Sequence, residues 1–141
     1  SGLIERERAA GIERLETYRS FAENVKETKR KLLECLIAIK RGGKSIAGFG
    51  APGKGNTLLN YCGIRTDFLD YTIDRNPYKQ GKFTPGTHIP ILHPDTIRES
   101  RPDYVLILPW NLREEAMRSL DYIRSWGGRF IVPIPEVTVI D

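Results

Sequence analysis

The chain has 141 residues, of which 40% are hydrophobic and 28% charged, as expected for one globular domain. No apolar run approaches the roughly 18 residues that a membrane span needs, and no charged-then-apolar leader opens the chain. We therefore expect a cytoplasmic protein with no membrane partner.

The formal net charge of +4 arises mainly in residues 1–43, where the basic side chains of Lys26, Lys29, Arg30 and Lys31 cluster. We interpret this cluster as the solvated face of a helix. Binding to nucleic acid usually requires a longer basic stripe and a recognition element, and neither is evident. The charge pattern therefore predicts no nucleic-acid partner.

The two cysteines, Cys35 and Cys62, each lie inside an apolar helical pattern and form no CxxC pair. This placement is typical of buried thiols in a reducing compartment. Together with His88 and His93 they are too few to predict a zinc site.

Residues 1–11 are charged and contain Gly11, so we expect a flexible N-terminal segment there. From Ile12 to Arg41 apolar residues recur at steps of three and four, which predicts a long helix that ends at Gly42-Gly43. The apolar stripe of this helix consists of Tyr18, Ala22, Val25, Leu32, Leu36 and Ile39. We expect the stripe to pack on the sheet or on a neighbouring domain, while Lys26, Lys29 and Lys31 stay solvated.

The remainder, residues 44–141, alternates short apolar strands with helices. Strands are predicted at 45–49, 69–73, 89–91, 104–108, 130–132 and 137–140, and helices at 56–61, 94–100 and 111–126. This alternation predicts an α/β fold with a mostly parallel sheet of five or six strands, and the continuous apolar run at 104–108 predicts a central strand. Asn111 is predicted to cap the last helix.

The segment from Gly48 to Thr57 lies between the first strand and its helix, where backbone N–H groups attract anions. One interpretation is a dinucleotide fingerprint, because Gly48, Gly50 and Gly53 match G-x-G-x-x-G. Asp74 follows Gly53 by 21 residues, where an acid that binds the ribose of NAD belongs. The alternative is a tight turn that requires glycine for steric reasons alone.

Two further interpretations fit the same loop less well. A Walker A loop would need Ser or Thr where Gly55 stands, and Pro52 removes one N–H donor. A loop that binds S-adenosylmethionine usually has an acid before its glycines, where this chain has Ile46 and Ala47.

Further segments combine with the glycine loop into a longer pattern. The four segments are GFGAPGKGNTLLNYC (48–62), DYTIDRNPYKQGK (70–82), PGTHIPI (85–91) and RPDYVLILPWN (101–111). In this order they resemble the C-terminal domain of S-adenosylmethionine-dependent sugar C-methyltransferases, the NDP-hexose C-methyltransferase family. The resemblance covers roughly residues 12–140, and several long segments in order are more specific than one glycine motif.

The resemblance implies a Rossmann-like three-layer domain over 12–141, with a long helix at 12–41 and an α/β core at 44–141. Family members act on nucleotide-linked keto-deoxysugars, and this domain helps to bind the nucleotide-sugar. The whole enzyme would transfer a methyl group to a carbon next to a ketone, after a base removes the α-proton to form an enolate.

This chain departs from the family by omission, because it has neither the usual zinc-binding cysteines nor a separate domain for the methyl donor. We therefore expect S-adenosylmethionine to bind to an N-terminal methyltransferase domain of the same polypeptide that is absent from this chain. No catalytic or metal-binding residue is assigned here, and the isolated chain should be inactive.

Ligands of open α/β sheets lie beyond the carboxyl ends of the strands. Four loops should meet there, and they supply the candidate substrate-binding residues Gly50, Ala51, Gly53, Lys54, Gly55, Asn56, Asp74, Arg75, Asn76, Trp110, Asn111 and Glu136. Lys54 would counter phosphate charge, Asp74 accept from a hydroxyl, and Trp110 stack on a base or sugar.

Each of these residues also has a structural alternative: a solvated lysine, an aspartate that caps its own turn with Asn76, or a tryptophan packed against the sheet. Two other functions stay open at this point. One is a NAD-binding domain of an oxidoreductase or regulatory protein. The other is a scaffold domain whose long helix docks other parts.

Overall fold

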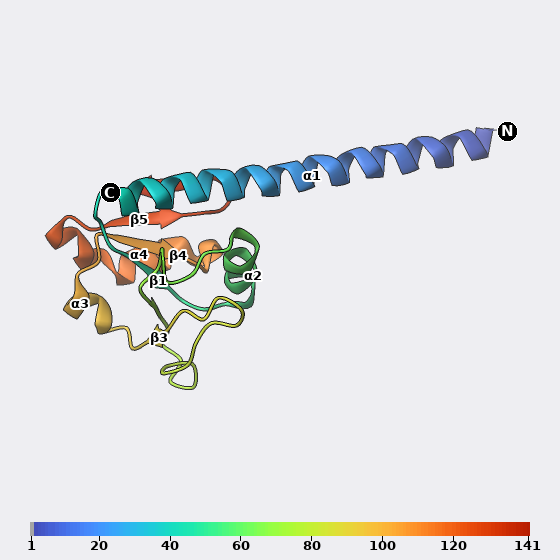
Figure 1. Ribbon diagram of the computed structural model, residues 1–141. Coiled ribbons are helices and arrows are strands. Elements are labelled where there is room, and N and C mark those ends of the chain that lie inside the picture. The colour runs from blue at the N-terminus through green and yellow to red at the C-terminus, as the bar shows by residue number, and fades with distance from the viewer. Residues whose placement is uncertain (1) are drawn as a thin grey trace.

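A six-stranded sheet organises the structure, a computed structural model that describes residues 2–141 (Figure 1). In chain order its strands are β1 (Ile46–Phe49), β2 (Thr72–Ile73), β3 (Ile91–Leu92), β4 (Tyr104–Ile107), β5 (Arg129–Val132) and β6 (Thr138–Ile140). Their spatial order is β3-β2-β1-β4-β5-β6, and every neighbouring pair is parallel except β5 and β6. The predicted α/β fold is confirmed, with β4 central between β1 and β5.

Helices cover both faces of the sheet, because successive side chains of each strand point to opposite faces. On one face Ile46, Leu106 and Ile131 form a core with the helices α1 and α2. On the other face Ala47, Val105 and Phe130 form a second core with α3, α4 and the 3-10 helix η2. The bounds are α1 (Gly2–Arg41), α2 (Gly53–Cys62), α3 (Thr96–Ser100), α4 (Arg113–Ser119) and η2 (Asp121–Trp126).

The long helix α1 lies across the sheet with its C-terminal half only, and its N-terminal half extends away from the domain (Figure 1). Leu32, Leu36 and Ile39 are buried against the sheet, as the apolar stripe predicted. Gly43 ends the helix with φ of +75°, a backbone angle that favours glycine. None of the helices in residues 2–141, including α1, combines the length and hydrophobicity of a membrane span.

Helix α1 begins at Gly2, so it includes most of the segment 1–11 that the sequence predicted to be flexible. The charged residues and alanines on the N-terminal side of Gly11 are good helix formers, and they offset the cost of about 1 kcal/mol for one glycine in a helix. The basic face is solvated at Lys26 and Lys31 as predicted. Lys29 is half-buried, with its Nζ 5.1 Å from the centre of the Tyr61 ring.

The predicted helix 111–126 is divided into three short pieces. A 3-10 helix, η1 (Trp110–Leu112), precedes α4, and η2 follows it. The N-cap position of α4 is Leu112, and no side chain caps it. The prediction that Asn111 is the N-cap was therefore wrong, because its side-chain oxygen accepts a hydrogen bond from Lys54 instead.

Both thiols are free: Cys62 is buried and Cys35 half-buried. Burial raises the pKa of each thiol above its ordinary value, although Lys29 opposes this effect at Cys62. Both side chains therefore stay protonated at neutral pH and pack as small apolar groups. Within residues 2–141, no three His, Cys, Asp or Glu side chains gather as metal ligands.

The packing of α2 against β4 predicts unequal effects for two neighbouring glycines. A Cβ at Gly55 would lie 2.9 Å from the Cβ of Leu108, whereas a Cβ at Gly53 would meet nothing within 4 Å. We expect Gly55→Ala to lower the free energy of unfolding by about 1–3 kcal/mol, as overpacking does. The control Gly53→Ala should leave it unchanged or raise it by up to about 1 kcal/mol. Urea unfolding of both variants measures the difference, and equal stabilities would contradict this packing.

Candidate functional site

The candidate site lies at the carboxyl edge of the parallel strands, where three loops meet. Gly50 follows β1, Asp74 follows β2, and Pro109 lies in the connection after β4. The chain is drawn together here by backbone hydrogen bonds, since the Gly50 N–H donates to the Ile73 carbonyl at 2.6 Å. The Thr72 hydroxyl also donates to the Gly50 carbonyl, at 2.7 Å.

The glycine loop takes its sharp turn at Gly50, where φ is +84°. A Cβ at this position would lie 3.0 Å from the Cδ of Pro109, so the β4 connection packs directly on the loop. Any larger residue would separate the two loops and strain the backbone. Glycine at this position therefore brings the start of α2 close to Trp110 and Asn111.

Helix α2 starts without a side-chain cap, because Pro52 occupies its N-cap position. The Asn56 N–H donates to the Pro52 carbonyl at 2.9 Å, so it is not free to bind an anion. The remaining first-turn positions are Gly53, Lys54 and Gly55, of which Gly53 and Lys54 are exposed. The positive end of the helix dipole favours an anion at this point.

Three of the predicted site residues come together beside this helix start. The Lys54 Nζ donates to the Asn111 Oδ1 at 2.5 Å, and it lies 5.1 Å from the centre of the Trp110 ring. Trp110 is half-buried, and part of it packs against the core formed with α4. Trp110 therefore packs against the core, as the structural alternative predicted. Its ring also lies next to Lys54 at the carboxyl edge of the sheet.

Asp74 serves its own loop, as the structural alternative proposed. Its Oδ1 accepts from the Asn76 N–H at 2.9 Å, and the Asn76 Oδ1 accepts from the Tyr78 N–H at 3.0 Å. The Asp74 Oδ2 lies 3.8 Å from the Lys79 Nζ, and the Asp74 side chain is only 17% exposed. The carboxylate therefore has partners within the loop that follows β2.

Lys79 is a site residue that the sequence reasoning did not select. Its Nζ donates to the Ala51 carbonyl at 3.1 Å and so ties the loop after β2 to the glycine loop. No spacing rule could have indicated this contact, because the two residues are far apart in sequence and Lys79 lies in an irregular loop. Two lysines therefore lie close to the start of α2: Lys54 in its first turn, and Lys79 at the carbonyl of Ala51, which precedes the helix.

A cleft of about 210 Å³ opens at the same edge, on the side of α4. Gly50, Asp74 and Arg75 line it, as predicted site residues, and Glu115 and Ser119 of α4 complete its polar wall. Sequence reasoning did not select Glu115 for the site, because an acid near a helix start is favoured in any helix. The cleft therefore places both signs of charge around a small cavity next to the glycine loop.

Two predicted residues stand apart from these contacts. Glu136 lines one cavity beside α1 with Asn24 and Lys31 and another with Arg113 of α4, and neither cavity includes a residue of the glycine loop. Asn56 is half-buried, and its Oδ1 is buried without a hydrogen-bond donor among the described residues. Its Nδ2 reaches the Ala51 carbonyl at 3.5 Å.

Comparisons with known proteins agree with the family inferred from sequence. Residues 1–135 match the C-methyltransferase C-terminal domain. A curated relative, the C-methyltransferase NovU of Streptomyces niveus, is 39% identical over 138 residues. The alignment covers 98% of this chain and 33% of NovU, so the chain spans about a third of its relative's length. The chain belongs to the C-methyltransferase C-terminal domain family.

Proposed function

We propose that this chain is the nucleotide-sugar-binding domain of an S-adenosylmethionine-dependent C-methyltransferase that acts on nucleotide-linked keto-deoxysugars. Membership of the family supports the reaction class. The observation that carries the binding role is the uncapped start of α2, flanked by Lys54, Trp110 and Asn111 at the carboxyl edge.

The diphosphate would lie against the first turn of α2. Three of the glycines nearby are required by packing, because a Cβ at Gly48, Gly50 or Gly55 would come within 3.0 Å of a neighbouring side chain. Gly53 has no such reason, since a Cβ there would meet nothing within 4 Å. An open, exposed glycine at a helix start lets a phosphate approach the backbone N–H groups closely.

The base or sugar would stack on Trp110, with Lys54 moving between two partners. In the structure the Lys54 ammonium is held by the Asn111 Oδ1 close to the tryptophan ring. A phosphate at the helix start would attract the same ammonium, and the Asn111 amide could then serve the ligand. Arg75, which is exposed and lines the adjacent cleft together with Gly50, adds a second positive charge.

The glycine geometry does not support NAD binding. In the dinucleotide fingerprint the second glycine opens to the pyrophosphate and the third packs helix against strand. Here the second, Gly50, is covered by Pro109, and the third, Gly53, packs against nothing. Helix–strand contact falls to Gly55 instead, and Asp74 is engaged by the Asn76 N–H.

The methyl donor does not fit this chain for related reasons. The glycines are not preceded by an acid. The two positions before them hold Ile46 and Ala47, which are buried strand residues. The carboxylate after β2, Asp74, is bonded within its own loop. We therefore assign S-adenosylmethionine and the catalytic base to the part of a longer polypeptide that these 141 residues do not include. The isolated chain should transfer no methyl group.

Calorimetric titration with thymidine diphosphate tests the proposed binding site. We expect weak, saturable binding that decreases as salt is added. Lys54→Ala should weaken it by about 1.5 kcal/mol, the lower end for a hydrogen bond to a charged group because this lysine is exposed. Lys44→Ala is the matched control, since Lys44 is also exposed but precedes β1 at the opposite edge of the sheet.

The open space at Gly53 gives a second prediction for the same titration. Gly53→Val should abolish thymidine diphosphate binding, because a β-branched side chain would fill the space through which the phosphate approaches. Gly53→Ala should show an intermediate loss while the domain stays folded. Unchanged affinity in both variants would mean that this glycine loop serves only as a turn.

The NAD alternative is tested separately with Asp74→Asn. We expect no measurable NAD binding to the unmodified chain, so the substitution should have no binding to remove. Saturable NAD binding that Asp74→Asn abolishes would favour an oxidoreductase or regulatory domain, since a hydrogen bond to a charged group contributes about 1.5–3 kcal/mol.

A further inference from the structure

The N-terminal half of α1 presents large apolar side chains to solvent. Leu15, Tyr18 and Phe21 are 47%, 69% and 66% exposed, and the smaller Ala22 and Val25 beside them are half-buried. We call these five residues the free face of α1. Exposed apolar groups gathered on one helix face usually mark an interaction surface.

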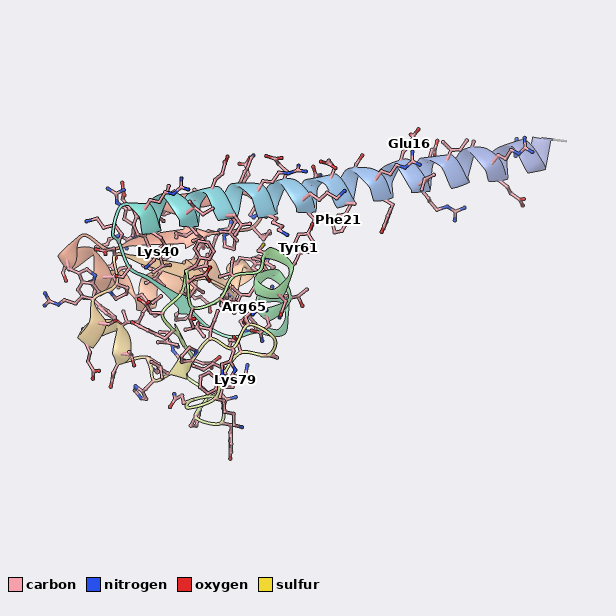
Figure 2. The ribbon with its side chains drawn as sticks, viewed as in Figure 1. Glu16, Phe21, Lys40, Tyr61, Arg65 and Lys79 are labelled. Carbon is pink, nitrogen blue, oxygen red and sulfur yellow. The ribbon has the colours of Figure 1, made fainter. Side chains whose placement is uncertain are left out.

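The free face continues the buried face of the same helix. Leu15, Tyr18, Ala22 and Val25 follow one another at steps of three and four, and the same steps lead on to the buried Leu32, Leu36 and Ile39. Figure 2 shows Phe21 on the side of α1 that faces the domain and Glu16 on the opposite side. One stripe is therefore covered by the sheet in its second half and uncovered in its first.

The free face projects past the carboxyl edge, where the candidate site lies. The loop after β5, with Glu136 and Val137, lines a cavity with α1 residues from Asn24 to Lys31. At about 1.5 Å of rise per residue, Leu15 and Tyr18 lie roughly 10–20 Å beyond that loop. Any body seated on the free face would therefore overhang the carboxyl edge, on the face of the sheet that α1 and α2 cover.

The charged residues of α1 favour one kind of binding partner for the free face over another. Glu13, Glu16, Glu23 and Glu27 lie on the side away from the apolar stripe at 100° per residue. Arg14 and Arg19 instead lie beside Leu15 and Tyr18. A second copy of the chain would bring these arginines against their equivalents, so the charge favours an apolar partner surface with an acidic rim.

We propose that the free face docks the remaining part of the longer polypeptide, which would then close over the nucleotide-sugar. This inference rests on the proposed function, because the occupant is the part assigned to the methyl donor. The length of NovU supports this occupant, because the chain matches only 33% of that relative. The rest of a polypeptide of similar length would be large enough to cover the free face. This contact would bury the apolar side chains in the first half of the stripe, which are exposed in the 141-residue chain.

Hydrogen exchange at the backbone amides of residues 12–22 tests the docking. We would compare the 141-residue chain with the full-length polypeptide that contains it. In the isolated chain these amides should exchange quickly, because a solvated helix without tertiary packing is marginally stable. In the full-length polypeptide we expect exchange at least about tenfold slower, which corresponds to about 1.4 kcal/mol of local stabilisation.

Tyr18→Asp in the full-length polypeptide should remove this protection. Ser20→Asp is the matched control, because it places the same charge in the same helix on the side away from the stripe. Equal exchange in the two forms of the wild type, or equal effects of the two substitutions, would overturn the proposal. So would a concentration-dependent dimer of the isolated chain in sedimentation, with the same amides protected, because the face would then bind a second copy.

Thymidine diphosphate binding to the 141-residue chain separates this proposal from the previous one. Tyr18→Asp should leave that binding unchanged, because Tyr18 lies on the projecting helix and touches none of the candidate site residues. Protection of residues 12–22 without diphosphate binding would overturn the binding role alone. Diphosphate binding without protection would overturn the docking alone.

Discussion

The close approach of the glycine loop to the end of β4 is the constraint on which the candidate site depends. Gly50 turns beneath Pro109, and Gly55 packs against Leu108. At both positions a methyl group would come within about 3 Å of its neighbour, which real contacts rarely tolerate. Because these two glycines hold the loops together, a side chain at the start of α2 can meet the 3-10 helix that follows β4.

The arrangement is preorganised by groups that are already paired. Lys54 is held by Asn111, Lys79 by the Ala51 carbonyl, and Asp74 by the turn it caps. Such pairing limits the side-chain motion that a ligand must arrest, and so it lowers the entropic cost of binding. At the proposed diphosphate site, an anion would have to compete with Asn111 for Lys54, and this competition would keep its affinity modest.

The elements of the core were predictable because their patterns are local. Strand runs such as Tyr104–Leu108 and the stop at Gly42-Gly43 need no knowledge of distant residues. The rule that ligands lie at the carboxyl edge then predicted that Gly50, Asp74 and Trp110 lie in the same region. What could not be predicted depends on contacts across the fold. Whether Gly53 or Gly55 contacts the sheet depends on the rotation of α2 about its own axis. The contact between Lys54 and Asn111 depends on how the loops after β1 and β4 pack together.

The antiparallel strand β6 has a practical consequence for work on this domain. It turns the chain back, so Asp141 ends at the amino edge, where Arg129 Nε lies 2.8 Å from its Oδ1. The first residues of α1 lie far from this point (Figure 1). An affinity tag or a surface linker attached after Asp141 would therefore leave the ligand edge and the projecting helix accessible. Immobilisation through the N-terminus would instead restrict access to the projecting half of α1.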